Sequence, residues 1–191
     1  MRVFLAIFPP AQTQQLAHSA AVRVREAAGA AASTVSWVKL ENLHYTLSFL
    51  GELGEDGTRR AGEAASEAAG GLTAFDVALG GAGAFPNVGH ARVLWLGLDR
   101  GAGEFTDLAR RVEGALVKRG FDREKRPFSP HLTIGRVRNP RHDFGAALAA
   151  VPSLANESAA RFRVASVRVV RSTLSPKGSI YEVVAEARLS G

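Results

Sequence analysis

Short segments of the chain either alternate hydrophobic and polar residues, as at 75–79 and 162–174, or are apolar almost throughout, as at 3–8 and 91–98, and both patterns are typical of strands. β-Branched and aromatic residues dominate these segments, as they do in sheets. The predicted strands cover 3–8, 35–38, 75–79, 91–98, 162–174 and 180–189, with two more beginning at His44 and His131. Apolar residues at helical spacing predict helices over 10–28, 56–69, 104–119 and 141–151.

Glycine and proline mark the predicted connections. Gly80–Gly89 is predicted to be a glycine-rich loop, and Ser175–Ser179 a turn that joins the last two strands into a hairpin. The order of elements predicts an α+β protein with two mainly antiparallel sheets and helices on the outside. The strands that begin at His44 and His131 occupy corresponding positions in two halves. We therefore expect residues 1–191 to form a single bilobal domain with pseudo-two-fold symmetry and a central cleft.

The two strands that begin with histidine carry the same motif. His44 and Thr46 lie two residues apart, as do His131 and Thr133. Side chains two apart on a strand share a face, so each histidine is expected on the same face as its threonine. Apolar neighbours, among them Tyr45, are expected to face the core.

Composition favours a globular protein with an anionic partner. The chain has 191 residues, 46% of them hydrophobic and 22% charged, which argues against disorder. Its formal net charge of +6 favours RNA, nucleotides or phosphate esters. A general preference for arginine as a surface residue explains the charge equally well.

The chain has no cysteine, which excludes disulfides, thiolate zinc sites and cysteine nucleophiles. The apolar segment at 1–8 is too short for a signal peptide and ends at two prolines, and no segment approaches the ~20 apolar residues of a membrane span. We expect a cytoplasmic protein with no membrane partner.

Two matched histidines suit acid–base chemistry on a phosphate. One imidazole takes a proton from the nucleophile while the other gives a proton to the leaving oxygen. The hydroxyls of Thr46 and Thr133 supply hydrogen bonds to the non-bridging oxygens. Arg126 or Arg136 would add a charge-assisted bond to the phosphate. Because strict alternation points Arg136 away from His131, Arg126 is the predicted phosphate ligand.

Other uses of these residues stay open. Each histidine could be a structural residue bonded to its own threonine. A metal site would need a third ligand, and neither strand carries a carboxylate beside its histidine on the same face. The remaining histidines, His18, His90 and His142, have no evident chemical partner. The basic charge also fits a module that binds RNA or a nucleotide without turnover.

The paired motifs resemble those of the 2H phosphoesterase superfamily. Segments around 41–51, 92–97 and 126–131 are similar to its RNA 2′,3′-cyclic phosphodiesterase branch, historically called 2′-5′ RNA ligase. Both chain ends, at 2–7 and 172–182, are similar as well, so the resemblance covers nearly the whole chain. Two positions depart from the usual pattern: Tyr45 replaces an aliphatic residue, and Gly135 follows the second motif.

The resemblance implies hydrolysis of RNA 2′,3′-cyclic phosphate ends to 2′-phosphomonoesters, with no metal or other cofactor. We also expect the protein to be a monomer. His44 would be the proton donor to the 3′ leaving oxygen and His131 the acceptor that activates water. Thr46 and Thr133 would bind the phosphate oxygens. The same pair would serve reversible 2′-5′ RNA ligation, and a small cyclic nucleotide or another cyclic diester would also fit as substrate.

Overall fold

A computed structural model describes residues 1–138, 142–176 and 178–191. Within these ranges nine strands form one sheet, and all pairs of named strands are antiparallel. The strands are β1 (Arg2–Ile7), β2 (Val35–Trp37), β3 (Tyr45–Glu52), β4 (Phe75–Phe85), β5 (Val93–Arg100), β6 (Leu132–Val137), β7 (Arg161–Val164), β8 (Ser166–Ser175) and β9 (Gly178–Arg188). The α+β class and the antiparallel pairing are confirmed.

The sheet has two halves that meet at β3 and β6. The strand order is β7-β4-β5-β6-β3-β1-β8-β9, with β2 on β6, and Tyr45 pairs with Leu132 at the junction. Reading outward from the junction, each half contains four strands in corresponding places, which is the expected two-lobed arrangement. The two predicted sheets are thus joined edge to edge.

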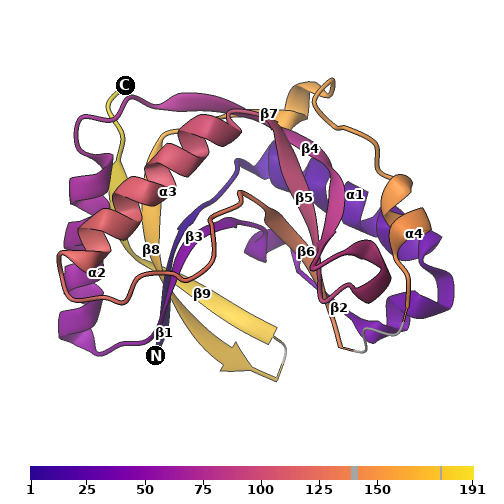
Figure 1. The fold of residues 1–191 in the computed structure, drawn as a ribbon, viewed down its shortest axis with the longest axis horizontal. Coiled ribbons are helices and arrows are strands. Elements are labelled where there is room, and N and C mark those ends of the chain that lie inside the picture. The colour runs from indigo at the N-terminus through magenta and orange to yellow at the C-terminus, as the bar shows by residue number, and fades with distance from the viewer. Residues whose placement is uncertain (139–141, 177) are drawn as a thin grey trace.

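Helices cover the outside of both halves. They are α1 (Ala11–Ala27), α2 (Glu55–Ala69), α3 (Ala102–Val117) and α4 (Gly145–Ala149), with short 3₁₀ turns η1 (Gly29–Thr34), η2 (Leu40–Asn42), η3 (Val88–His90) and η4 (Ser158–Ala160). In Figure 1, α2 and α3 lie over one half of the sheet, and α1 and α4 lie over the other. The helix expected over 141–151 is the shorter α4, and Arg141 lies outside the described residues.

The main core lies between the sheet and the helices. Val3, Leu5 and Ile7 of β1 are buried in it, as are Tyr45 and Leu132 at the junction. The alternate β1 residues Phe4 and Ala6 face the other way and form a small cluster with Val170, Phe8 and Tyr181. The inner face of the sheet therefore has its own apolar patch, on the side that the helices leave open.

Two predicted boundaries are wrong. The segment predicted as a glycine-rich loop largely continues β4, because Gly80 and Gly83 allow β5 to approach closely. A Cβ on Gly83 would lie 2.4 Å from the Trp95 ring, and one on Gly80 would lie 2.4 Å from Asp99 Oδ1. The strand predicted over 162–174 is two strands, β7 and β8, which pair with β4 and β1 at opposite ends of the sheet.

Candidate active site

The pairing of β3 with β6 brings the two motifs together. His44 and His131 each lie immediately before their strand, one residue from the Tyr45–Leu132 pair. Extending that antiparallel register by one residue sets His44 opposite Thr133, and His131 opposite Thr46. All four side chains are partly buried, whereas Tyr45 and Leu132 between them are fully buried on the other face. Each histidine therefore faces the threonine of the other motif.

Both imidazoles are held through the same nitrogen. His44 Nδ1 lies 2.7 Å from the carbonyl oxygen of Asn42, and His131 Nδ1 lies 2.7 Å from that of Ser129. A carbonyl oxygen only accepts, so each Nδ1 carries the proton and donates it. Nε2 is then the nitrogen left for chemistry in both rings, which matches the two-fold arrangement of the strands.

His44 Nε2 also contacts its own threonine. The Thr46 hydroxyl lies 3.0 Å from Nε2, and in the neutral ring it donates to that nitrogen. This is the bond that the structural interpretation of the motif predicts. For His131, no residue in the described part of the chain is within hydrogen-bond range of Nε2. The two histidines thus share a tautomer but differ in their partners.

Aromatic rings surround His44. Phe4 and Phe8 stack on the imidazole with ring centroids 4.9 and 5.3 Å away, and Tyr181 meets it edge-on at 5.4 Å. The burial lowers the pKa of His44 to about 4, against the opposing effect of its bond to the Asn42 carbonyl. The charge of Arg136 lowers this pKa further, as does that of His131 when its ring is protonated.

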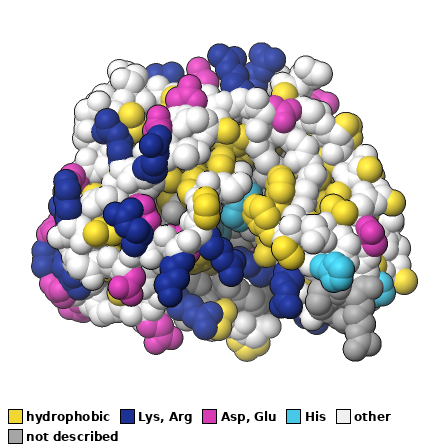
Figure 2. Space-filling view, viewed as in Figure 1, with side chains coloured by type: hydrophobic (Ala, Val, Ile, Leu, Met, Phe, Trp, Pro, Cys, Tyr) yellow, Lys and Arg dark blue, Asp and Glu magenta, His cyan; other side chains and the backbone are white. Residues whose placement is uncertain are grey.

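His131 has a more open setting. Phe85 meets its ring edge-on at 5.0 Å, and Trp95 packs against Phe85 at 5.1 Å. Burial lowers the pKa of His131, opposed by the bond to the Ser129 carbonyl, and Arg136 lowers it further. Figure 2 shows a histidine near the centre of this face with hydrophobic side chains beside it and Lys and Arg side chains below.

The arginine that lies with the histidines is Arg136, so the prediction that it points away is wrong. Its charge acts on His44, His131 and Tyr181. The register of β5 on β6 shifts by one residue, since Leu94 pairs with Gly135 and Trp95 with Thr133. This β-bulge reverses the alternation after Ile134. Arg126 is exposed on the loop before β6, where its backbone N–H donates to Glu124.

Residues outside the motifs complete the site. Sequence reasoning missed the rings of Phe4, Phe8 and Tyr181, although the apolar residues on both faces of β1 were a usable signal. It also missed Asn42, whose carbonyl holds His44 and whose side chain donates to the Ser179 carbonyl at 2.9 Å. Asn42 thereby connects the β8–β9 hairpin to the imidazole.

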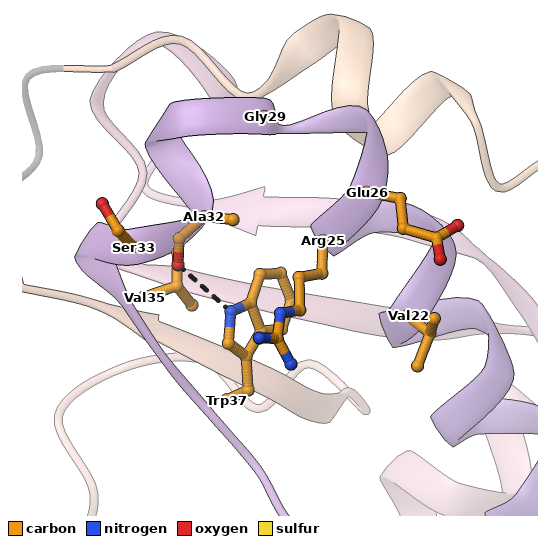
Figure 3. A pocket seen from close by; sticks show the side chains of 8 residues that line it. All are labelled: Val22, Arg25, Glu26, Gly29, Ala32, Ser33, Val35 and Trp37. Carbon is orange, nitrogen blue, oxygen red and sulfur yellow. Dashed lines mark hydrogen bonds between the residues drawn. The ribbon is translucent and has the colours of Figure 1, made fainter.

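The described residues contain no group of three His, Asp or Glu side chains placed to hold a metal. None of their helices is long and apolar enough to cross a bilayer. A pocket of about 590 Å³ lies at the end of α1, away from both histidines (Figure 3). It is lined by Val22, Arg25, Glu26, Gly29, Ala32, Ser33, Val35 and Trp37, and Trp37 Nε1 donates to the Ala32 carbonyl.

Comparison with known proteins finds a matching family and similar relatives over most of the chain. The sequence profile of the 2′-5′ RNA ligase superfamily matches residues 9–175. The RNA 2′,3′-cyclic phosphodiesterase of Methanothermobacter thermautotrophicus is 39% identical over 160 residues, covering 83% of this chain and 85% of the relative. That of Archaeoglobus fulgidus is 41% identical over 150 residues, covering 78% and 81%.

Solved structures share the fold. The protein TT0787 of Thermus thermophilus superposes with a TM-score of 0.80 at 28% identity, over 100% of this chain and 99% of the other. LigT of E. coli, solved with 3′-AMP, superposes with a TM-score of 0.77 at 23% identity, over 100% and 98%. Both superpositions extend over the full length of this chain, so the fold as a whole is shared.

Proposed function

The chain belongs to the 2′-5′ RNA ligase superfamily, and on that premise we propose that it is an RNA 2′,3′-cyclic phosphodiesterase. The observation that carries the proposal is the pairing of the two motifs across β3 and β6. It sets two imidazoles of the same tautomer on one face, each opposite the threonine of the other motif. A phosphate between them would have an acid, a base and two hydroxyl donors within reach.

Hydrolysis then needs two proton transfers. His131 Nε2 takes a proton from water as the water oxygen bonds to phosphorus. The bond from phosphorus to the 3′ oxygen breaks, and His44 Nε2 gives its proton to that oxygen. The product is a 2′-phosphomonoester with a free 3′-hydroxyl. The division of roles between the two histidines comes from the family resemblance, because the geometry near the junction is two-fold.

The low pKa of His44 makes substrate binding part of the mechanism. A ring with a pKa of about 4 is neutral near pH 7 and has no proton on Nε2 to give. An anionic phosphate beside a buried imidazole favours the protonated form and raises its pKa. Protonated Nε2 becomes a donor, which frees the Thr46 hydroxyl to turn from His44 to a phosphate oxygen. Thr133 would hold the phosphate from the opposite strand.

Arg136 and Arg126 have different places in this proposal. Arg136 lies where its charge acts on both histidines, so it is the arginine we expect to contact the phosphate. Arg126 is exposed on a loop before β6, and its contact with substrate stays a prediction. Metal independence, 2′-5′ ligation with a 5′-hydroxyl in place of water, the single domain, the monomeric state and cytoplasmic location also stay predictions.

Product analysis tests the proposal directly. The protein is incubated in EDTA with an RNA oligonucleotide that ends in a 2′,3′-cyclic phosphate, and the ends are identified by mass and by resistance to a 3′-specific phosphatase. We expect a 2′-phosphate. A 3′-phosphate product would contradict the assignment of the acid, and activity that chelation abolishes and Mg²⁺ restores would contradict metal independence.

Alanine substitutions separate catalysis from binding. His44→Ala and His131→Ala should each lower kcat by roughly 10²-fold or more, since general acid–base catalysis contributes about that much. His90→Ala, at an exposed position on η3, is the matched control. If the wild-type protein hydrolyses no cyclic end, and RNA binding survives in both His44→Ala and His131→Ala, the binding module would be favoured instead.

A further inference from the structure

A second pocket, of about 650 Å³, adjoins His44. Three of its lining residues touch that histidine: Phe8 stacks on the ring, Tyr181 meets it edge-on, and Asn42 accepts its Nδ1 proton. The pocket therefore shares three of its lining residues with the surroundings of the proposed proton donor. It is lined by Phe8, Pro9, Gln14, Lys39, Glu41, Asn42, Arg168, Ser175, Gly178, Ser179, Ile180, Tyr181 and Val183.

Two cations line this pocket, together with the single carboxylate Glu41 among its described lining residues. Arg168 lies over the Phe8 ring, with its guanidinium carbon 5.6 Å from the centroid, and pairs through Nε with Glu186 at 3.1 Å. No described residue bonds its two terminal nitrogens. Those nitrogens suit a phosphate oxygen, which accepts charge-assisted bonds.

The β8–β9 hairpin supplies an apolar wall. It extends from the body of the sheet in Figure 1. Ile180 is 59% exposed and Val183 49% exposed, both unusually open for such residues, and both line the pocket beside Tyr181. Unpaired bases stack on aromatic and apolar side chains of this kind. Cations at one side and apolar surface at the other suit a nucleotide better than inorganic phosphate alone.

The proposed roles of the two histidines determine which strand would lie there. His44 gives its proton to the 3′ oxygen, so the ribose that carries the cyclic phosphate is on the His44 side. The nucleotides before that ribose continue on the same side, whereas the attacking water or 5′-hydroxyl approaches His131. A pocket next to His44 is therefore positioned for the strand that carries the cyclic end.

We propose that this pocket binds the nucleotide immediately 5′ of the cyclic end, with Arg168 and Lys39 on its phosphate and the Ile180–Tyr181 surface against its base. The proposal rests on the proposed function. It makes the enzyme prefer an RNA end to a cyclic mononucleotide, because a mononucleotide has no preceding phosphate to bind.

Paired substrates test the assignment. kcat/KM is measured on uridine 2′,3′-cyclic phosphate and on a uridine trinucleotide with the same cyclic end, for wild type, Lys39→Ala and Arg168→Ala. Each variant should lose about tenfold more on the trinucleotide than on the mononucleotide, the value expected for one charge-assisted bond. Arg23→Ala, at an exposed position on α1, is the control, and it should leave kcat/KM unchanged on both substrates. Equal losses on both substrates would overturn the proposal.

Binding supplies a readout that does not need turnover. The probe is a fluorescein-labelled uridine trinucleotide that ends in a 2′-phosphate, followed by anisotropy. Both variants should raise its Kd about tenfold, and the slope of log K against log[salt] should fall by about 0.7 for each lost phosphate contact. Wild-type affinity in both variants would overturn the pocket assignment. A wild-type protein that binds this probe but leaves cyclic ends intact would refute the proposed function alone.

Discussion

Ile134 and Gly135 are neighbours on β6, yet both face the core. Ile134 is fully buried, and a Cβ on Gly135 would lie 2.6 Å from Val35 Cγ1 and 3.4 Å from the Trp37 ring. Two adjacent residues on one face are the mark of a β-bulge. The bulge is what returns Arg136 to the face that His44 and His131 share.

Replacement of Arg136 by methionine keeps much of its length and removes its charge. Because this cation lowers the pKa of both histidines, Arg136→Met should raise both values, as NMR titration of the imidazole protons would show. It should also lower kcat/KM on a cyclic-ended RNA roughly tenfold to a hundredfold if it holds the phosphate. Arg100→Met, at the far end of β5, is the control, and unchanged imidazole pKa values in Arg136→Met would contradict the placement.

Gly135 makes the bulge possible, so it should resist substitution. The Cβ of alanine would lie too close to Val35, and relief requires β2 or β6 to move. We expect Gly135→Ala to lower the free energy of unfolding by about 1–3 kcal/mol, as overpacking usually does. Urea unfolding measures the loss, and Gly103→Ala, which meets open space on α3, is the matched control. A stability equal to that of wild type would mean that the strands adjust freely.

The alternation of strand residues correctly predicted the face of every motif residue. It failed for Arg136, three residues after Thr133. Tyr45 and Leu132 are fully buried, whereas the histidines and threonines on the other face are only partly buried, because a strand of regular pleat has only two faces. A bulge adds one residue and reverses that rule, and sequence parity alone does not reveal it. The one local sign was Gly135, which is the residue type that close packing against Val35 requires.

The other features that the sequence did not predict also depend on backbone groups or on tertiary packing. Glycines in β4 looked like a loop because glycine favours turns, but here they leave room for the Trp95 ring. The carbonyls of Asn42 and Ser129 hold the two imidazoles, and a backbone group leaves no mark on residue type. The aromatic cluster around His44 depends on which strands neighbour β1, which is tertiary information.

The burial of neutral His44 should make the fold sensitive to acid. Its pKa is about 4 in the folded chain and ~6.5 when unfolded, so the unfolded state binds more protons between these values. Stability should therefore fall as pH drops from 6.5 towards 4, by roughly 3 kcal/mol from this group. Urea unfolding at pH 7 and pH 4.5 should show a smaller difference for His44→Gln than for wild type. An identical difference in both proteins would contradict the burial of an uncharged ring.

The same shifts set the pH dependence of catalysis. The profile of kcat/KM reports the free enzyme, in which both histidine pKa values lie below 6.5. The state in which the histidine pair holds a single proton is most populated between the two apparent pKa values of the pair. The value of kcat/KM should therefore peak on the acid side of pH 6.5. Bound phosphate raises the pKa of the acid, so the basic limb of kcat should lie at higher pH. Superimposable profiles of kcat and kcat/KM would contradict a substrate-induced shift.

Tyr45 carries a hydroxyl that the site does not use. The ring is fully buried against Phe105 and Phe162, with centroids 5.1 and 6.3 Å away, and no described residue bonds the hydroxyl. Burial accordingly raises the pKa of Tyr45. A buried hydroxyl without a partner costs free energy, so Tyr45→Phe should stabilise the fold by about 1 kcal/mol with kcat unchanged. Urea unfolding measures the free energy of unfolding, and the hydrolysis assay measures kcat. Tyr181→Phe, which removes the hydroxyl of the tyrosine beside His44, is the comparison. A less stable Tyr45→Phe protein would mean that the hydroxyl is hydrogen-bonded, for instance to a buried water.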